Sequence, residues 1–133
     1  MRRLAVLLAL VLAAPAAADV LLGAHELRGW DVLAEAPVGP HMDPDLAEWG
    51  VAEKRVRHYT RMRGGAVEVC SVEVWRFDSV AQATAAAQGF AFPDWRIDRV
   101  GAVLVMLHGR SGVRRGVFPA CQRLGARVRD RAS

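Results

Sequence analysis

Residues 55–77 read RVRHYTRMRGGAVEVCSVEVWRF, and this stretch decides the fold class. Residues 55–62 alternate in character, with Arg55, Arg57, Tyr59 and Arg61 at every second position. Residues 67–77 are rich in the β-branched and aromatic types that favour strands. The pair Gly64 and Gly65 between them is typical of a two-residue turn in which both residues take positive φ. The stretch therefore predicts a β-hairpin.

The segments after the hairpin predict a helix and two further strands. Ser79 and Gln82 have the spacing of a capping box, which predicts a helix over residues 80–88. Residues 96–100 and 102–108 predict two strands separated by a glycine. The second of these strands is apolar on both faces, as expected of a central strand that is covered on both sides, wholly or in part.

The two ends of the chain predict shorter elements and a final helix. Residues 29–34 predict a short strand, the proline-rich residues 36–44 predict a loop, and residues 45–50 predict one helical turn. A glycine-rich turn is expected at residues 109–112. A last helix should begin at Pro119, with an apolar stripe made of Cys121, Leu124 and Val128.

These elements predict an α+β fold: a mainly antiparallel sheet of about four to five strands with two helices packed on one face. Residues 19–133 are expected to form a single domain, because a chain of this size supports one modest core.

The first residues have the composition of a secretory signal peptide. Arg2 and Arg3 precede an apolar run, which is followed by Pro15 and a run of alanines that ends at Ala18. The apolar run is shorter than the roughly 20 residues that a membrane-spanning helix needs. We therefore predict cleavage after Ala18, with the mature protein periplasmic or secreted and without a stable membrane anchor.

The charge of the chain does not predict a nucleic-acid-binding protein. The formal net charge of +4 includes Arg2 and Arg3, which leave with the signal peptide. The mature domain is therefore close to balanced, and no nucleic-acid partner is predicted.

The two cysteines, Cys70 and Cys121, predict one disulfide bond, because an exported chain meets an oxidising environment. Buried free cysteines are the alternative, since the sequence does not show whether the two sulfur atoms meet.

Four arginines on one predicted strand are candidate anion-facing residues. A two-residue turn at Gly64 and Gly65 pairs Arg61 with Glu68, and it pairs Met62 with Val67 to begin a core face that includes Val69. Continued without interruption, this register would place two valines on the arginine face. We therefore predict a β-bulge at Cys70 and Ser71, which returns Val72 and Val74 to the core face and moves Glu73 opposite Arg57 and Trp75 opposite Arg55. The candidate residues are Arg55, Arg57, Arg61 and Arg63.

No catalytic, cofactor-binding or metal-binding motif is evident from spacing alone. The four histidines are far apart in the sequence, and none belongs to a zinc or haem motif. Ser79 is explained by helix capping, and the GRSG stretch at residues 109–112 lacks the lysine of a phosphate-binding loop. Clustering of histidines with a carboxylate in one cleft would favour an enzyme. The histidines are His25, His41, His58 and His108.

Residues 49–108 resemble small exported bacterial α+β domains of unknown function. The features that carry the resemblance are Tyr59 on a strand, the valine-rich strand ending at Phe77, and Ser79 leading into an alanine-rich helix. The resemblance implies the fold class and the compartment, and it implies no catalytic residue.

The sequence favours an exported, non-catalytic binding or interaction module whose partner is an unknown protein or small molecule. One alternative is a small extracytoplasmic enzyme with a site assembled from scattered residues. A second alternative is an anion or polysaccharide binder that uses the arginines of residues 55–63, which requires several of them on one uncompensated face.

Overall fold

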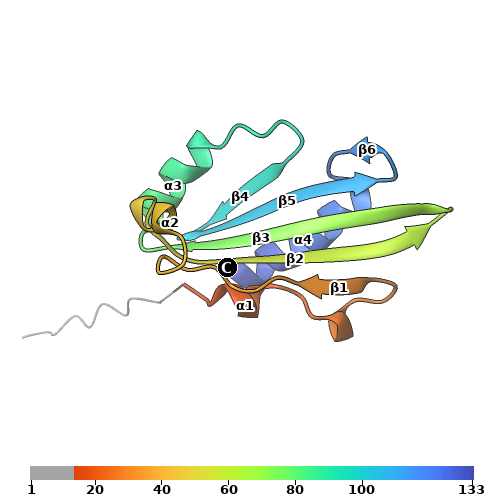
Figure 1. The fold of residues 1–133 in the computed structure, drawn as a ribbon, viewed down its shortest axis with the longest axis horizontal. Helices are drawn as coiled ribbons and strands as arrows, with labels where there is room; N and C mark the ends of the chain where they lie inside the picture. The colour runs from red at the N-terminus through yellow and green to blue at the C-terminus, as the bar shows by residue number, and fades with distance from the viewer. Residues whose placement is uncertain (1–13) are drawn as a thin grey trace, which may run out of the picture.

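The computed structural model describes residues 14–133, in which a six-stranded antiparallel sheet has helices against both faces (Figure 1). The strand order is β1-β2-β3-β5-β4, and β6 pairs with the end of β5. The predicted α+β class and mainly antiparallel sheet are confirmed, with six strands in place of four to five. The strands are β1 (Asp31–Ala34), β2 (Val51–Arg63), β3 (Ala66–Phe77), β4 (Arg96–Val100), β5 (Val103–Ser111) and β6 (Arg114–Arg115).

Four α-helices and one 3-10 helix complete the described chain, and two of them are long enough to cover the sheet. The helix α3 (Val80–Gly89) begins as predicted at Ser79, whose hydroxyl accepts from the Gln82 amide at 3.2 Å. The helix α4 (Pro119–Ala132) buries the predicted apolar stripe. The short elements are α1 (Ala17–Val20), η1 (Ala24–Glu26) and α2 (Pro44–Glu48).

The two longer helices lie on opposite faces of the sheet, so the prediction that both pack on one face was wrong. In β5, Val105 and Leu107 belong to the apolar cluster that includes Leu124 and Val128 of α4. The alternate residues of β5 belong to the cluster that includes Ala83 of α3. A central strand that is apolar on both sides needs cover on both sides. We call these sides the α4 face and the α3 face; α4 runs behind the sheet in Figure 1.

The hairpin of β2 and β3 has the predicted turn. Gly64 and Gly65 have φ of 57° and 78°, and Arg61 pairs with Glu68. The predicted bulge at Cys70 and Ser71 was wrong, because the register runs unbroken through both residues.

The observed irregularity lies between Val51 and Glu53, at the start of β2. Without a bulge in β3, Glu73 lies opposite Val56, not opposite Arg57, and Trp75 lies opposite Lys54, not opposite Arg55. No bulge is needed, because the arginine face is itself the α4 face. There Val72 and Val74 join the core beneath the helix.

The predicted core face of Met62, Val67 and Val69 was also wrong. Met62 is 66% exposed and Val67 is 46% exposed. These residues lie on the α3 face, but α3 does not extend far enough along the sheet to cover them. The helix contacts β3, β4 and β5, and it lies with α2 at the left end of the sheet in Figure 1. The α3 face therefore has a covered half and an open half.

The turn expected at residues 109–112 begins later in the chain. Residues 109–111 continue β5, and the chain reverses at Gly112, which has φ of 59° and leads into β6.

The predicted disulfide is present and joins the sheet to the helix α4. Cys70 of β3 is bonded to Cys121 of α4, with the two Cα atoms 5.3 Å apart. Gly125 lets the same helix approach β5 closely, since a Cβ atom at this position would overlap the side chain of Leu107.

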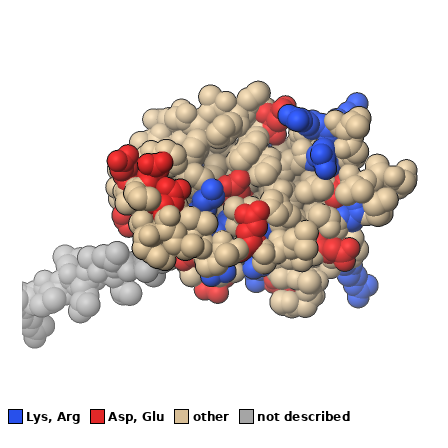
Figure 2. Space-filling view, in the orientation of Figure 1, with Lys and Arg blue, Asp and Glu red and all other residues tan. Residues whose placement is uncertain are grey.

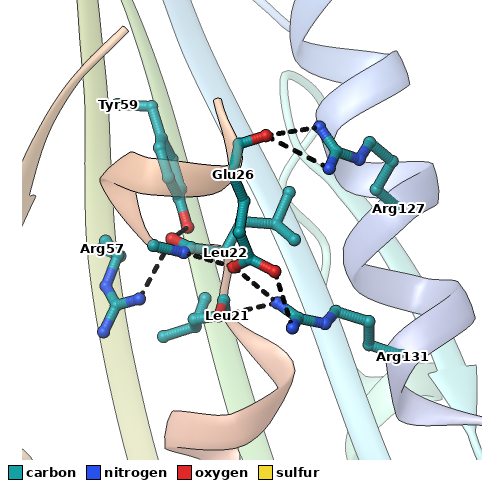
Figure 3. A network of polar contacts seen from close by, with 8 residues as sticks. Leu21, Leu22, Glu26, Arg57, Tyr59, Arg127 and Arg131 are labelled. Atoms are coloured by element: carbon teal, nitrogen blue, oxygen red, sulfur yellow. Dashed lines mark hydrogen bonds and ion pairs between the residues drawn. The ribbon is translucent and has the colours of Figure 1, made fainter. Parts of the chain in front are cut away.

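The segment before β1 is held against β2 and α4 by polar contacts to its backbone (Figure 3). The hydroxyl of Tyr59 donates to the carbonyl oxygen of Leu22 at 2.8 Å, and Arg57 donates to the same oxygen at 3.0 Å. Arg131 donates to the Leu21 carbonyl at 3.3 Å and pairs with Glu26. Backbone and side-chain hydrogen bonds, from Gly23 first and then from Arg131, hold the pKa of Glu26 below its usual value.

Residues 1–13 of the predicted signal peptide lie outside the described residues. Ala17, which precedes the predicted cleavage site, is buried with Val20, Leu21 and Leu22. The last three belong to the predicted mature protein. Within residues 14–133, no helix is long and apolar enough to cross a membrane.

Candidate functional site

The candidate anion-facing arginines lie on the α4 face, where three of them have partners. Arg57 binds the Leu22 carbonyl, Arg61 pairs with Glu68 at 2.9 Å, and Arg55 lies 3.8 Å from a carboxylate oxygen of Glu53. Arg63 is exposed at the end of β2. The four side chains share a face, as predicted, but Arg55 and Arg57 are separated from the other two by buried Tyr59.

A row of polar side chains crosses the opposite, α3 face at the edge of its covered half. The strand register places His58 of β2 opposite Ser71 of β3, and Ser71 opposite His108 of β5. In His58, Nδ1 lies 2.6 Å from Ser71 Oγ, and Nε2 lies 2.5 Å from Glu35 Oε1. Glu35 follows β1 and is positioned by its backbone amide, which donates to the Val56 carbonyl.

These two contacts determine the tautomer of His58. A carboxylate only accepts hydrogen bonds, so the nitrogen that faces Glu35, Nε2, carries a proton. In the neutral ring Nδ1 then has a free electron pair, and it accepts the hydroxyl proton of Ser71. Glu35 thus orients His58, and His58 polarises the Ser71 hydroxyl.

The second histidine of the row is held by a different carboxylate. His108 Nε2 lies 3.0 Å from Glu73 Oε2, and Trp75 Nε1 donates to Glu73 Oε1 at 3.1 Å. Lys54 Nζ lies 3.7 Å from the same oxygen. Burial raises the pKa of Glu73, but the hydrogen bonds from His108 and Trp75 and the charge of Lys54 together hold it below its usual value.

A hollow of about 310 Å³ opens beside this row. It forms because β4 and β6 pair with different parts of β5: β4 reaches Leu107, β6 begins its pairing at Arg110, and His108 and Gly109 lie between. We call this hollow the edge pocket. Its lining residues are Val69, Ser71, Asp94, Trp95, His108, Gly109, Arg110 and Arg115.

The edge pocket combines an aromatic wall with positive charge. The rings of Trp95 and His108 stack with centroids 4.0 Å apart. Arg110 and Arg115 are paired across β5 and β6, so their side chains lie on the same face, and Asp94 supplies one opposing charge. Figure 2 shows Lys and Arg side chains gathered at the upper right, over the end of the sheet where Figure 1 places β6.

The other candidates from the sequence lie elsewhere. His25 is in η1 and His41 is in the loop before α2. Among residues 14–133, no group of three or more His, Cys, Asp or Glu side chains is placed to hold a metal ion.

One feature of the sequence indicates part of this site. A two-residue turn at Gly64 and Gly65 pairs His58 with Ser71 if the register is unbroken. The predicted bulge at Cys70 and Ser71 obscured this pairing. His108 lies in β5 and Trp95 lies in the segment before β4. Local sequence patterns do not predict that these two side chains come into contact.

Comparison with models of known protein families, with curated proteins and with solved structures finds no match for this chain. Its function is therefore inferred from the geometry of the edge pocket.

Proposed function

We propose that this protein is an extracytoplasmic binding domain that holds a small anion with a planar apolar group, such as an aromatic carboxylate, in the edge pocket. The observation that carries the proposal is the stack of Trp95 and His108 in a hollow that Arg110 and Arg115 also line. Small-molecule sites combine an apolar wall with a few polar groups that orient the ligand, and their volumes begin at about 300 Å³.

Each part of the pocket has a defined task in this proposal. The indole of Trp95 contacts the planar group, and Arg110 and Arg115 pair with the anionic group through charge-assisted hydrogen bonds. Ser71 lines the pocket, is paired with His108 in the sheet, and offers a hydroxyl to the ligand. Because Glu73 anchors His108, the aromatic wall is formed before the ligand arrives, which lowers the entropic cost of binding.

The location outside the cytoplasm is part of the proposal. The disulfide between Cys70 and Cys121 supports it, since such bonds persist in oxidising compartments. The expected signal peptide at residues 1–18 supports it independently.

Isothermal titration calorimetry with benzoate tests the binding site. We expect one site per chain, and we expect Arg115→Ala to weaken binding about tenfold or more, because a hydrogen bond to a charged group contributes about 1.5 to 3 kcal/mol. Arg114→Ala is the matched control, because Arg114 belongs to the same strand but pairs with Ser111 and lies outside the pocket lining. Equal loss in both variants, or no binding to the wild type, would contradict the proposal.

A second candidate function is binding of a polyanion at the opposite face. Arg61 and Arg123 line two adjoining hollows of about 210 and 440 Å³ near the start of α4. Arg28 and Arg127 line the first hollow and Arg63 lines the second, where Glu68 is the one acidic lining residue. This set uses half of the predicted row, and Glu68 neutralises Arg61 within it. The positive charge of this face therefore comes mainly from Arg28, Arg63, Arg123 and Arg127.

Retention on a heparin column tests the second candidate. We expect Arg123→Ala to elute at a lower salt concentration than the wild type, because salt screens exposed charges. Arg99→Ala, on β4, removes an exposed arginine far from these hollows in the sheet order and should elute with the wild type. Coelution of all three proteins would exclude this function.

A further inference from the structure

We propose that Ser71 is a nucleophile that cleaves carboxylic esters bound in the edge pocket. This inference rests on the proposed binding function and names its substrate: an ester whose acid product is the kind of carboxylate that the pocket holds. Three groups carry it, in the order Glu35, His58 and Ser71, and consecutive groups are joined by hydrogen bonds of 2.5 and 2.6 Å.

The arrangement has the parts that activate a serine hydroxyl. A base within hydrogen-bond distance accepts the proton, and a third group orients the base and stabilises its charged form. His58 is the base, because its Nδ1 accepts from Ser71 Oγ. Glu35 is the positioning residue, because it holds the protonated Nε2.

The accessibility of the three groups suits this chemistry. Ser71 is only 4% exposed, yet it lines the edge pocket, so a bound ligand and not bulk solvent reaches it. The Glu35 side chain is 56% exposed at the outer end, where proton exchange with water is possible. A purely structural serine in a central strand does not require this connection to the surface.

The reaction needs only the ester and water. Ser71 Oγ attacks the ester carbonyl carbon while its proton passes to His58 Nδ1. The carbon–oxygen bond to the alcohol then breaks, the alcohol leaves with the proton from His58, and an acyl group remains on Ser71. Water attacks this acyl group as His58 removes its proton, the proton returns to Ser71 Oγ, and the carboxylic acid is released.

The positive side chains of the pocket supply charge stabilisation for the addition step. Negative charge develops on the carbonyl oxygen when Ser71 adds to the ester, and guanidinium groups lower the energy of such a charge. Arg110 and Arg115 are the cationic side chains of the pocket lining. They also hold the product carboxylate in the proposed binding function.

Covalent labelling tests the nucleophile directly. Treatment with a fluorophosphonate, followed by intact-mass and peptide mass spectrometry, should give one adduct on Ser71. The Ser71→Ala variant should give none, and Ser111→Ala, which changes a serine at the end of β5, should be labelled as the wild type is. Circular dichroism should show that both variants are folded.

Glu35→Gln provides a second test with little risk to folding, since Glu35 is at the surface. We expect the rate of p-nitrophenyl benzoate hydrolysis to fall about tenfold or more, because the carboxylate that orients the base beside a serine nucleophile contributes up to about 10⁴-fold. The pH dependence of the rate should change as well, which loss of a structural contact alone would not produce.

The outcomes separate this inference from the binding function. Benzoate binding without any adduct on Ser71 would overturn the nucleophile and leave the binding function standing. An adduct on Ser71 without benzoate binding would support the nucleophile and refute the proposed ligand class. Labelling that persists in Ser71→Ala would also overturn the inference.

Discussion

The imidazole of His108 lies against the indole of Trp95, with an angle of 16° between the ring planes. The two residues come from β5 and from the segment that leads into β4, and together they form the aromatic wall of the edge pocket. His108 is in turn held by Glu73. Glu73 therefore joins the pocket wall to β3, where it also accepts a hydrogen bond from Trp75.

Replacing Trp95 should weaken ligand binding while the protein remains folded. We expect Trp95→Ala to lower benzoate affinity about threefold to tenfold, because an aromatic pair contributes about 0.5 to 1.5 kcal/mol beyond its buried area. Trp49→Ala is the control, since Trp49 is 50% exposed and lines a different hollow. Calorimetry of both variants measures the difference, and equal affinities would show that Trp95 does not contact the ligand.

The carboxylate of Glu73 should stabilise the protein in a pH-dependent way. Its pKa is lower in the folded protein than its usual value, so its contribution is present above the usual pKa and is lost as the pH falls through the folded pKa. We expect Glu73→Gln to lower the free energy of unfolding by about 1 to 3 kcal/mol at pH 7. The difference from the wild type should shrink below about pH 4.

Urea unfolding at pH 7 and pH 3 measures this effect. Glu48→Gln, at an exposed position in α2, is the control and should differ little from the wild type at either pH. A difference for Glu73→Gln that stays constant with pH would contradict the assignment of a lowered pKa.

Removal of the disulfide should cost much of the stability of this small domain. Cys70 and Cys121 are separated by 51 positions. In the chain-entropy treatment, closing a loop of this length stabilises by roughly 4 kcal/mol. The double variant Cys70→Ala and Cys121→Ala should therefore unfold at much lower urea concentration. Thiol titration of the unfolded, unreduced wild type should find no free thiol, and two titratable thiols would refute the bond.

The first residues of the predicted mature chain should be part of the fold. Tyr59→Phe removes the hydroxyl that binds the Leu22 carbonyl and should cost about 0.5 to 1.5 kcal/mol. A variant that begins at Gly23 lacks Val20, Leu21 and Leu22 and should lose several kcal/mol, because each buried aliphatic side chain contributes about 1.5 to 3 kcal/mol. A protein that begins at Asp19 keeps these three side chains and lacks buried Ala17, so it should lose much less stability than the protein that begins at Gly23. Equal stability of the proteins beginning at Asp19 and Gly23 would contradict this role.

The elements that the sequence predicted correctly are those specified by local chemistry. The turn at Gly64 and Gly65 requires positive φ at both positions, and the Ser79 cap satisfies an amide of the following helix. The start of α4 at Pro119 follows from the same kind of local preference. Each of these features depends on residues that are adjacent or within one turn.

The errors concern long-range packing. The bulge predicted at Cys70 and Ser71 assumed that an arginine-rich face must be the solvent face. In the structure, α4 and the segment ending at Leu22 cover that face, and Arg57 extends to a backbone carbonyl at its margin. Which helix covers which face of a sheet depends on packing, and the hydrophobic pattern of a single strand does not specify it.

The site was missed for the same reason. His58 and Ser71 become neighbours through the hairpin register, but Glu35, His108 and Trp95 join them only through the pairing of β1, β4 and β5. The spacing of these residues in the sequence therefore matches no motif.

A nuclear magnetic resonance titration of the folded protein with benzoate tests most directly whether the edge pocket is the binding site. Chemical-shift changes should be largest at the backbone amides of Ser71, His108 and Arg110 and at the indole of Trp95, and they should saturate at one ligand per chain. The corresponding signals of residues around Trp49 and Arg123 should stay in place, because those residues line other hollows. Saturable shifts at either of those places with none around His108, or no saturable shifts at all, would contradict the edge pocket as the binding site.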